Sequence, residues 1–387
     1  MILNFFRWLL LIPVLGGTIF SLLCVWTALR FKRTKSPPDP AQWPPVTILK
    51  PVHGIEKKLL NNLRTTCQLD YPNYEVIFSV QRSNDPALPI LREIEAEFGP
   101  ERARIIVEEK RVGWNGKINN LAGALPHAKH EVLVISDSDV RLPRHYLKAV
   151  VAPLSDPSVG FVCTPYRVAE ANQWYEKLEL LSLNADFMPS VIFAYETAAS
   201  LFCLGASIAV RRQMIERIGG IEDLSDYLVE DYEMGRRIAA LGYKGLLVRP
   251  VVETMVDLKT YRDWWKHQVY WDQNTRAARP FAYLCTLLIR AIPCALILVL
   301  INPLSLMSWI ILTIAATMRL LTALFIMRFC LDDREGARAI LWLPLRDIAG
   351  MVSWLLSFVW RKTTWRGTEF RLTADGRLSQ GSPVGHS

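Results

Sequence analysis

The sequence lacks paired cysteines, internal repeats and any nucleic-acid-binding motif. Its seven cysteines are an odd number, are scattered along the chain and show no CxxC spacing. This distribution argues for a reducing compartment and against structural zinc or a disulfide framework. The net charge of +8 would fit a nucleic acid, an anionic lipid or an anionic substrate, and the basic residues just after the first apolar segment favour a membrane charge bias over nucleic-acid binding.

Charged residues are also scarce. They make up 21% of the 387 residues, against 51% hydrophobic residues, and the mean hydropathy is +0.17. Such a chain is too apolar for an ordinary soluble enzyme and too polar for a pure bundle of membrane helices. It predicts a soluble domain with a few membrane spans.

The first long apolar run covers residues 5–29, and a bilayer span needs about 20 residues. Basic residues rather than a small-residue cleavage site follow it, which favours a retained anchor over a signal peptide. One basic residue, Arg7, stands at the beginning of the run, and four follow it: Arg30, Lys32, Arg33 and Lys35. We therefore expect an anchor over residues 1–34, a proline-rich linker over 35–45 and a cytoplasmic domain after it.

The sequence becomes apolar again after Pro280. We expect two membrane helices within 281–327, at about 283–302 and 305–327. Residues 328–362 include Arg346 and Asp347, whose charges are costly inside a span. That segment is left open as interfacial, re-entrant or a third membrane segment, and basic residues after it predict a cytoplasmic tail over 363–387.

Residues 46–280 alternate short apolar runs with polar, periodic segments. This alternation predicts parallel βαβ units and a Rossmann-like α/β fold. The predicted strands begin at Val46, Tyr74, Ala103, Val132 and Gly160, and predicted helices over 88–98 and 119–128 lie between them.

Two carboxylates, Asp137 and Asp139, follow the buried strand that begins at Val132. Acids at i and i+2 of an extended chain point the same way, here at the sheet edge where open α/β sheets bind ligands. Mg²⁺ or Mn²⁺ takes one or two carboxylates together with substrate phosphates. Our hypothesis is the metal–diphosphate anchor of a sugar-nucleotide transferase, and the alternative is a solvated turn.

Two other predicted strand ends carry polar groups. Asp85 either accepts a hydrogen bond from a uracil N–H or caps the turn before Pro86. Residues 111–120 contain glycine, Lys117 and Asn119 at a predicted helix start. Such a loop suits a diphosphate or nucleotide sugar, and the alternative is a capped helix.

Adjacent acids, Glu230 and Asp231, precede an amphipathic helix pattern, where they are either caps or functional groups. Inverting sugar transfer needs a carboxylate that accepts the proton of the acceptor hydroxyl, a role that Asp231 would fill. A metal ion would stabilise the departing diphosphate, so no protein acid is needed on that side.

Two further segments are candidates for substrate contacts. Residues 184–210 are unusually apolar and either face the membrane and admit a lipid or form core helix and strand. Within them, Gly205 would let the backbone approach a sugar closely. Residues 261–276 are rich in aromatic side chains that suit a membrane interface, and Trp271 could stack on a sugar. The candidate phosphate contacts there are His267, Gln268 and Arg276.

Taken together, the motifs between about residues 46 and 280 resemble the ceramide glucosyltransferase family, glycosyltransferase family 21, within the GT-A superfamily. The resemblance implies Asp85 and Asp137 as donor-site acids and Asp231 as the base. It also implies a UDP-sugar donor, a membrane lipid acceptor and inversion at the anomeric carbon. The motifs that carry it lie at residues 47–54, 69–76, 80–87, 112–121, 136–139 and 230–234.

One motif departs from the family. Its members have Gln or Arg, two residues, then Arg-Trp, whereas this chain has His267-Gln-Val-Tyr270-Trp271. The departure leaves the donor sugar and the acceptor open. The sequence also resembles bacterial hopanoid-associated glycosyltransferases, which implies a multi-pass protein of the bacterial inner membrane.

We therefore expect a hexose, glucose or N-acetylglucosamine, to be moved from a UDP-sugar to a hydroxyl of a hopanoid or ceramide. The alternatives are a processive polysaccharide synthase of the chitin or hyaluronan type and a non-catalytic membrane scaffold. The presence of all four candidate acids argues against the scaffold: Asp85, Asp137, Asp139 and Asp231. The oligomeric state is left open.

Overall fold

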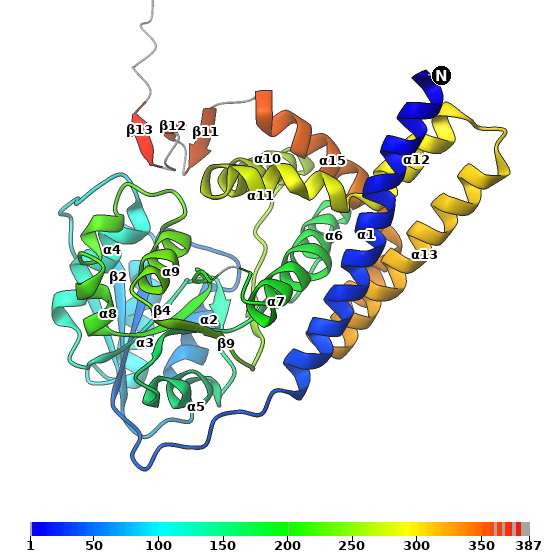
Figure 1. Ribbon diagram of the computed structural model, residues 1–387. Coiled ribbons are helices and arrows are strands. Elements are labelled where there is room, and N and C mark those ends of the chain that lie inside the picture. The colour runs from blue at the N-terminus through cyan, green and yellow to red at the C-terminus, as the bar shows by residue number, and fades with distance from the viewer. Residues whose placement is uncertain (1, 200, 360–361, 366–367, 374–376, 381–387) are drawn as a thin grey trace, which may run out of the picture.

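The computed structural model describes residues 2–199, 201–359, 362–365, 368–373 and 377–380. Figure 1 shows an α/β domain on one side and long helices on the other. The first helix, α1 (Ile2–Arg33), leads through the proline-rich linker into strand β1 (Val46–Pro51) of the α/β domain.

The central sheet has the strand order β3-β2-β1-β4-β8-β6-β9. Its strands run parallel except for β8, which is antiparallel to both β4 and β6. Strands β1, β2, β4 and β6 are buried at every position, as their continuous apolar runs predict. Besides β1, the strands are β2 (Tyr74–Val80), β3 (Ala103–Val107), β4 (Val132–Ser136), β6 (Val159–Cys163), β8 (Ser207–Arg211) and β9 (Lys244–Leu247).

The helices beside this sheet follow the predicted alternation, and the predicted α/β class is confirmed. The helix expected over 88–98 is α3 (Leu88–Phe98). The one expected over 119–128 begins earlier, as α4 (Gly116–Ala124), because the side chain of Asn115 caps it. The others are α2 (Leu59–Cys67), α5 (Tyr146–Val151), α8 (Arg212–Arg217) and α9 (Glu230–Ala240).

A small sheet of order β5-β10-β7 and several helices lie outside the central sheet. Its strand β7 is followed along the chain by α6, one turn of π-helix over Ser182–Phe187, and α7, whereas β10 comes after β9 and precedes α10. In Figure 1, α10 lies beside α15, above the α/β domain. The bounds are β5 (Val140–Arg141), β7 (Tyr166–Val168), β10 (Val252–Thr254), α6 (Trp174–Leu181), α7 (Met188–Glu196) and α10 (Tyr261–Ala278).

Among the described residues, three helices are long and apolar enough to cross a membrane: 5–33, 306–329 and 334–359. They correspond to α1, to α13 (Leu306–Phe329), and to α14 (Arg334–Ala339) with α15 (Leu343–Val359). Helix α1 packs against α7, α12 and α13.

The span expected over 283–302 is a bent pair of helices. Its two parts, Pro280–Ile289 and Ala291–Ile301, meet at 54°, and only together are they long and apolar enough to cross a membrane. They contain α11 (Pro280–Cys285) and α12 (Ala291–Ile301). The expected tail begins within a small antiparallel sheet, β11 (Lys362–Trp365), β12 (Thr368–Leu372) and β13 (Leu378–Gln380), and residues 381–387 lie outside the described part.

Candidate active site

The turn after β4 carries Asp137 and Asp139, and a buried lysine on β1 holds its backbone by hydrogen bonds. Lys50 is fully buried, and its Nζ donates to the backbone oxygens of Asp137 at 2.6 Å and Val140 at 3.0 Å. Burial lowers the pKa of Lys50 to about 8, although the carboxylates of Asp139 and Asp137 oppose that shift. Sequence reasoning missed this support, and its signal was a lysine at the end of an otherwise apolar strand.

Three segments far apart in the sequence converge at Gly205, just before β8. Its N–H donates to Asp231 Oδ2 at 2.6 Å. A Cβ on this glycine would stand 3.0 Å from Asp231 Oδ2, 3.2 Å from Lys117 Nζ and 3.6 Å from Asp137 Oδ2. The close backbone approach expected at Gly205 is therefore made to these charged groups.

Lys117 lies among three acids. Its Nζ is 2.7 Å from Asp137 Oδ1 and 3.0 Å from Glu230 Oε1. The other oxygen of Glu230 accepts a hydrogen bond from the Asn115 amide at 3.0 Å. Burial disfavours the charge on Lys117, but Asp137, Glu230 and Asp231 together raise the pKa of this lysine above its ordinary value. One positive charge thus neutralises only part of the acidic cluster.

Asp231 stands in the first turn of α9. Burial and the nearby Glu230 raise its pKa to about 7, against the lowering effects of Lys117 and of the backbone N–H groups of Tyr232 and Gly205. A carboxylate that exchanges its proton near neutral pH meets the requirement for a general base. The helix start that could have been a simple cap therefore also presents a titratable group to the site.

Asp139 and Asp137 both line a cavity at the turn after β4. Burial and the charge of Asp137 raise the pKa of Asp139 to about 6, while the Thr254 hydroxyl donates to Asp139 Oδ2 at 2.7 Å. No group of three or more His, Cys, Asp and Glu side chains gathers for a metal within the described residues. The pair would suit an ion that takes its remaining ligands from water and substrate phosphates.

A cavity of about 930 Å³ begins at these acids and extends to residues of α1, α12, α13 and α15. Its apolar end includes Phe20, Ala323 and Ile326. Ten of the residues predicted for the site line it: Lys117, Asp137, Asp139, Gly205, Glu230, Asp231, His267, Gln268, Tyr270 and Trp271.

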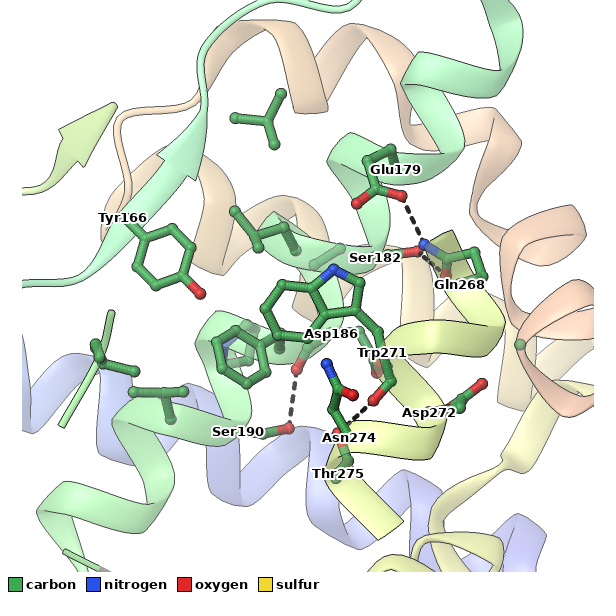
Figure 2. Close-up of a pocket in the computed structure, with 18 of the residues that line it drawn as sticks. Tyr166, Glu179, Ser182, Asp186, Ser190, Gln268, Trp271, Asp272, Asn274 and Thr275 are labelled. Carbon is green, nitrogen blue, oxygen red and sulfur yellow. Dashed lines mark hydrogen bonds between the residues drawn. The ribbon is translucent and has the colours of Figure 1, made fainter. Parts of the chain in front are cut away.

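The Trp271 side chain lines the cavity, where Figure 2 shows it near Asp186, and a chain of hydrogen bonds holds it. Trp271 Nε1 donates to His267 Nε2 at 2.9 Å, and His267 Nδ1 lies 3.0 Å from Glu179 Oε1. Gln268 Nε2 donates to the other oxygen of Glu179 at 2.6 Å. Burial lowers the pKa of His267, but Glu179 outweighs that effect and the net shift is upward. Glu179 was not predicted, since nothing in the sequence links it to residue 267.

Of the predicted substrate contacts, Asp85, Asn119 and Arg276 are not among the described residues that line the cavity. Asp85 is buried, and its Oδ1 accepts the N–H groups of Gly54 at 3.0 Å and Ala87 at 2.9 Å. The structure therefore shows the capping geometry that was the alternative for Asp85, and its uracil contact stays a prediction.

Asn119 and Arg276 are also engaged elsewhere. Asn119 Oδ1 accepts the N–H groups of Val112 and Gly113, so this side chain shapes the loop before α4. The Arg276 guanidinium lies over the ring of Phe358, 5.4 Å from its centroid. Their roles in substrate binding remain predictions.

Charged side chains that the site prediction omitted also line the cavity where it meets the long helices, among them Asp186, Arg319, Arg346 and Asp347. Arg346 and Asp347 had been noted only as charges in an ambiguous membrane segment. Their signal in the sequence was charge within apolar helices.

Comparison with known proteins gives a family match across nearly the whole chain. The model of the family described as "Glycosyl transferase family 21" matches residues 8–378.

Curated relatives agree with that match. Ceramide glucosyltransferase 1 of Caenorhabditis elegans is 24% identical over 215 residues, which are 55% of this chain and 46% of the relative. The probable glycosyltransferase YdaM of Bacillus subtilis is 24% identical over 242 residues, 60% of this chain and 56% of the relative. The chain spans about half the length of the curated relatives it matches.

Among solved structures, the fold is similar to that of a mannosyltransferase, PcManGT of Pyrobaculum calidifontis, solved in complex with GDP-Man and Mn²⁺. The TM-score is 0.56 at 24% identity, with 91% of this chain and 99% of the other covered. This similarity concerns the fold alone.

Proposed function

The chain belongs to glycosyl transferase family 21, and from that premise we propose that it is an inverting, UDP-sugar-dependent lipid hexosyltransferase. It moves glucose or N-acetylglucosamine to a hydroxyl of a membrane lipid, a hopanoid or a ceramide. The protein is a multi-pass membrane protein whose α/β domain is cytoplasmic, in the bacterial inner membrane.

The observation that carries this proposal is the convergence of Asp231 and Asp137 in a cavity that continues to the apolar helices. In the proposed step, the acceptor oxygen bonds to the anomeric carbon while the bond from that carbon to the UDP oxygen breaks. The acceptor proton passes to Asp231, whose raised pKa suits a base at neutral pH. Substrate arriving from the helical side and donor from the sheet side would meet there.

Asp137 and Asp139 would hold Mg²⁺ or Mn²⁺, which when bound supplies positive charge that stabilises the departing diphosphate. Lys117, already beside Asp137, contributes a second positive charge on the same side. Trp271 offers an aromatic face for the sugar or for the acceptor ring system, held in place by His267.

The experiment uses membranes that contain the full chain, incubated separately with UDP-glucose and UDP-N-acetylglucosamine, followed by mass analysis of the extracted lipids. We expect one of the two sugars to appear on a lipid of those membranes. A sugar polymer in place of a glycolipid would favour the processive synthase. Turnover of neither donor, with hopanoid and ceramide both supplied, would contradict the proposal.

A further inference from the structure

The charged cluster at the membrane-helix end of the cavity has an unusual location. Arg319 lies near the middle of α13, and Arg346 and Asp347 lie within α15, in two of the helices long and apolar enough to cross a membrane. Ionisable groups inside such helices are costly, so they are rare and commonly serve a ligand pathway. The cluster is completed by Asp186, on the π-helical turn between α6 and α7.

Both arginines contact both aspartates. Arg319 lies 3.1 Å from Asp186 and 3.0 Å from Asp347, and Arg346 lies 2.7 Å from Asp186 and 3.1 Å from Asp347. Arg319 also donates to the backbone oxygen of Ala185 at 2.9 Å. Two positive and two negative charges balance among these four side chains, and Arg290, which also lines the cavity, adds its positive charge near Asp186.

The two aspartates differ in what they face. The Asp347 side chain is 11% exposed and is enclosed with its arginines, whereas the Asp186 side chain is 42% exposed. Asp186 lines the cavity, and Figure 2 shows it beside Trp271. Burial disfavours its charge, but Arg346 and Arg319 outweigh this and lower the pKa of Asp186 to about 2. A charged oxygen thus faces a chamber whose neighbouring walls include Phe187 and Val191.

Ring contacts connect the residue beside Asp186 with the acidic end of the cavity. Tyr166 is close enough to Asp231, Asp137 and Asp139 for their charges to act on its hydroxyl. Its ring centroid lies 6.1 Å from that of Phe187, which lies 6.1 Å from that of Trp271. Asp186 directly precedes Phe187 in the chain and lines the same cavity, so an acceptor that extends from the apolar helices to Asp231 would pass this part of the cavity wall.

Each oxygen of Asp186 already contacts one arginine, but a lipid chain against the exposed part of this carboxylate would remove its remaining water contacts without replacing them, which is unfavourable. We propose that Asp186, held between Arg319 and Arg346, binds a second hydrogen-bond donor of the acceptor, a hydroxyl or amide N–H near the hydroxyl that receives the sugar. The site then selects polyhydroxylated or amide-bearing lipids over simple long-chain alcohols. This inference rests on the proposed function, because it assigns the lipid end of the same cavity.

The test compares two acceptors of equal chain length, 1,2-hexadecanediol and 1-hexadecanol, with the detergent-solubilised full chain. The wild type should prefer the diol in kcat/KM, and Asp186→Ala should reduce that preference by about tenfold to a hundredfold, the effect of one hydrogen bond to a charged group. An N-acylated amino alcohol of matched length tests the amide donor in the same way.

Asp347→Ala is the matched control, since it removes a partner from the same two arginines without touching the exposed carboxylate. It should keep the preference for the diol, whatever it does to stability. Equal loss in both variants would overturn the inference, and so would a wild type that treats diol and alcohol alike. If Asp186→Ala cannot be purified, Asp186→Asn keeps the shape, and we expect a smaller loss of preference in the same direction.

Binding of tritiated diol, competed by unlabelled alcohol, separates this inference from the proposed function. Binding of the diol that depends on Asp186 without any sugar transfer would support the subsite and contradict the transferase. Transfer to both lipids with no dependence on Asp186 would support the transferase and contradict the subsite. Preference for a long-chain phosphate monoester would also overturn the inference, because the arginines would then be the recognition groups.

Discussion

The two ends of the cavity contain similar numbers of charged side chains but differ in how the charges are balanced. At the sheet end, Asp137, Glu230 and Asp231 surround the single charge of Lys117. At the helical end, Arg319 and Arg346 each pair with both aspartates of their cluster. The first arrangement has a surplus of negative charge and the second has none.

From this difference we expect the sheet end to take part in the reaction and the helical end to select the lipid. Burial, together with the negative charges of Asp137 and Glu230, raises the pKa values of Asp139 and Asp231 to about 6 and 7, so that these groups can exchange a proton near neutral pH. The balanced cluster instead keeps Asp186 ionised, so it accepts hydrogen bonds but exchanges no proton near neutral pH. Changes at the sheet end should therefore alter rate and metal dependence, and changes at the helical end should alter the choice of lipid.

The largest effect is expected from Asp231→Asn. It removes the proposed base and should lower kcat by about 10³-fold or more, within the range for general-base catalysis. Binding of the UDP-sugar should stay nearly unchanged, measured by calorimetry on the same preparation. Asp223→Asn, an exposed acid paired with Arg237 in the same domain, is the control and should behave as wild type. Equal loss of binding and rate in Asp231→Asn would remove it from the base role.

Next in size is the effect of Lys117→Met on stability. Removing the cation leaves the buried Glu230 and the partly exposed Asp137 without their partner, and breaking a buried pair typically costs about 3 kcal/mol. The acids can take up protons, so the loss should shrink as the pH falls. Chemical denaturation at two pH values measures this loss of stability. The control is Arg338→Met, which breaks an exposed ion pair and should change the stability little. A loss that is the same at pH 5 and pH 8 would show that charge is not its cause.

A smaller effect is expected from Asp139→Ala, which removes one proposed metal ligand while Asp137 remains. UDP should bind about tenfold to a hundredfold more weakly in the presence of Mg²⁺ or Mn²⁺, the usual range for loss of a metal-site group. The same variant should show little change when a chelator is present, because the metal contribution is then already absent. If neither the chelator nor the substitution alters UDP binding, the carboxylate pair is no metal site.

Much of the sheet end could be predicted because its signals are local. A continuous apolar run followed by acids predicts a buried strand with a ligand at its end, and β4 with Asp137 and Asp139 follows that pattern. The reversed direction of β8 was not predictable, since a strand has the same period of two in either direction. The early start of α4 came from one capping side chain, Asn115.

The helical end could not be predicted because its contacts join segments far apart in the chain. Asp186 and Arg346 are 160 positions apart in the numbering, and only folding brings them to 2.7 Å. Glu179 and His267 form a similar distant pair. Asp85 shows the opposite problem, because local sequence allowed both a ligand contact and a cap, and the structure shows the cap geometry.

The last test concerns both ends together and varies only the pH. Asp231 has a pKa of about 7 in the folded chain against an ordinary value of 3.8. Because the base must be ionised, kcat/KM should rise by about tenfold per pH unit below pH 7 and level off above it.

Stability should move the other way over the same range. The folded chain holds the Asp231 proton more tightly than the unfolded chain does, so the stability contributed by the protonated group is lost as pH rises from about 4 to about 7. Asp139, with a pKa of about 6, acts in the same direction. Asp231→Asn should flatten the fall in Tm between pH 5 and pH 8, whereas Asp186→Asn should leave it in place, because the pKa of Asp186 lies well below that window. An equal effect of both variants on the pH dependence of Tm would mean that the two ends are electrostatically alike.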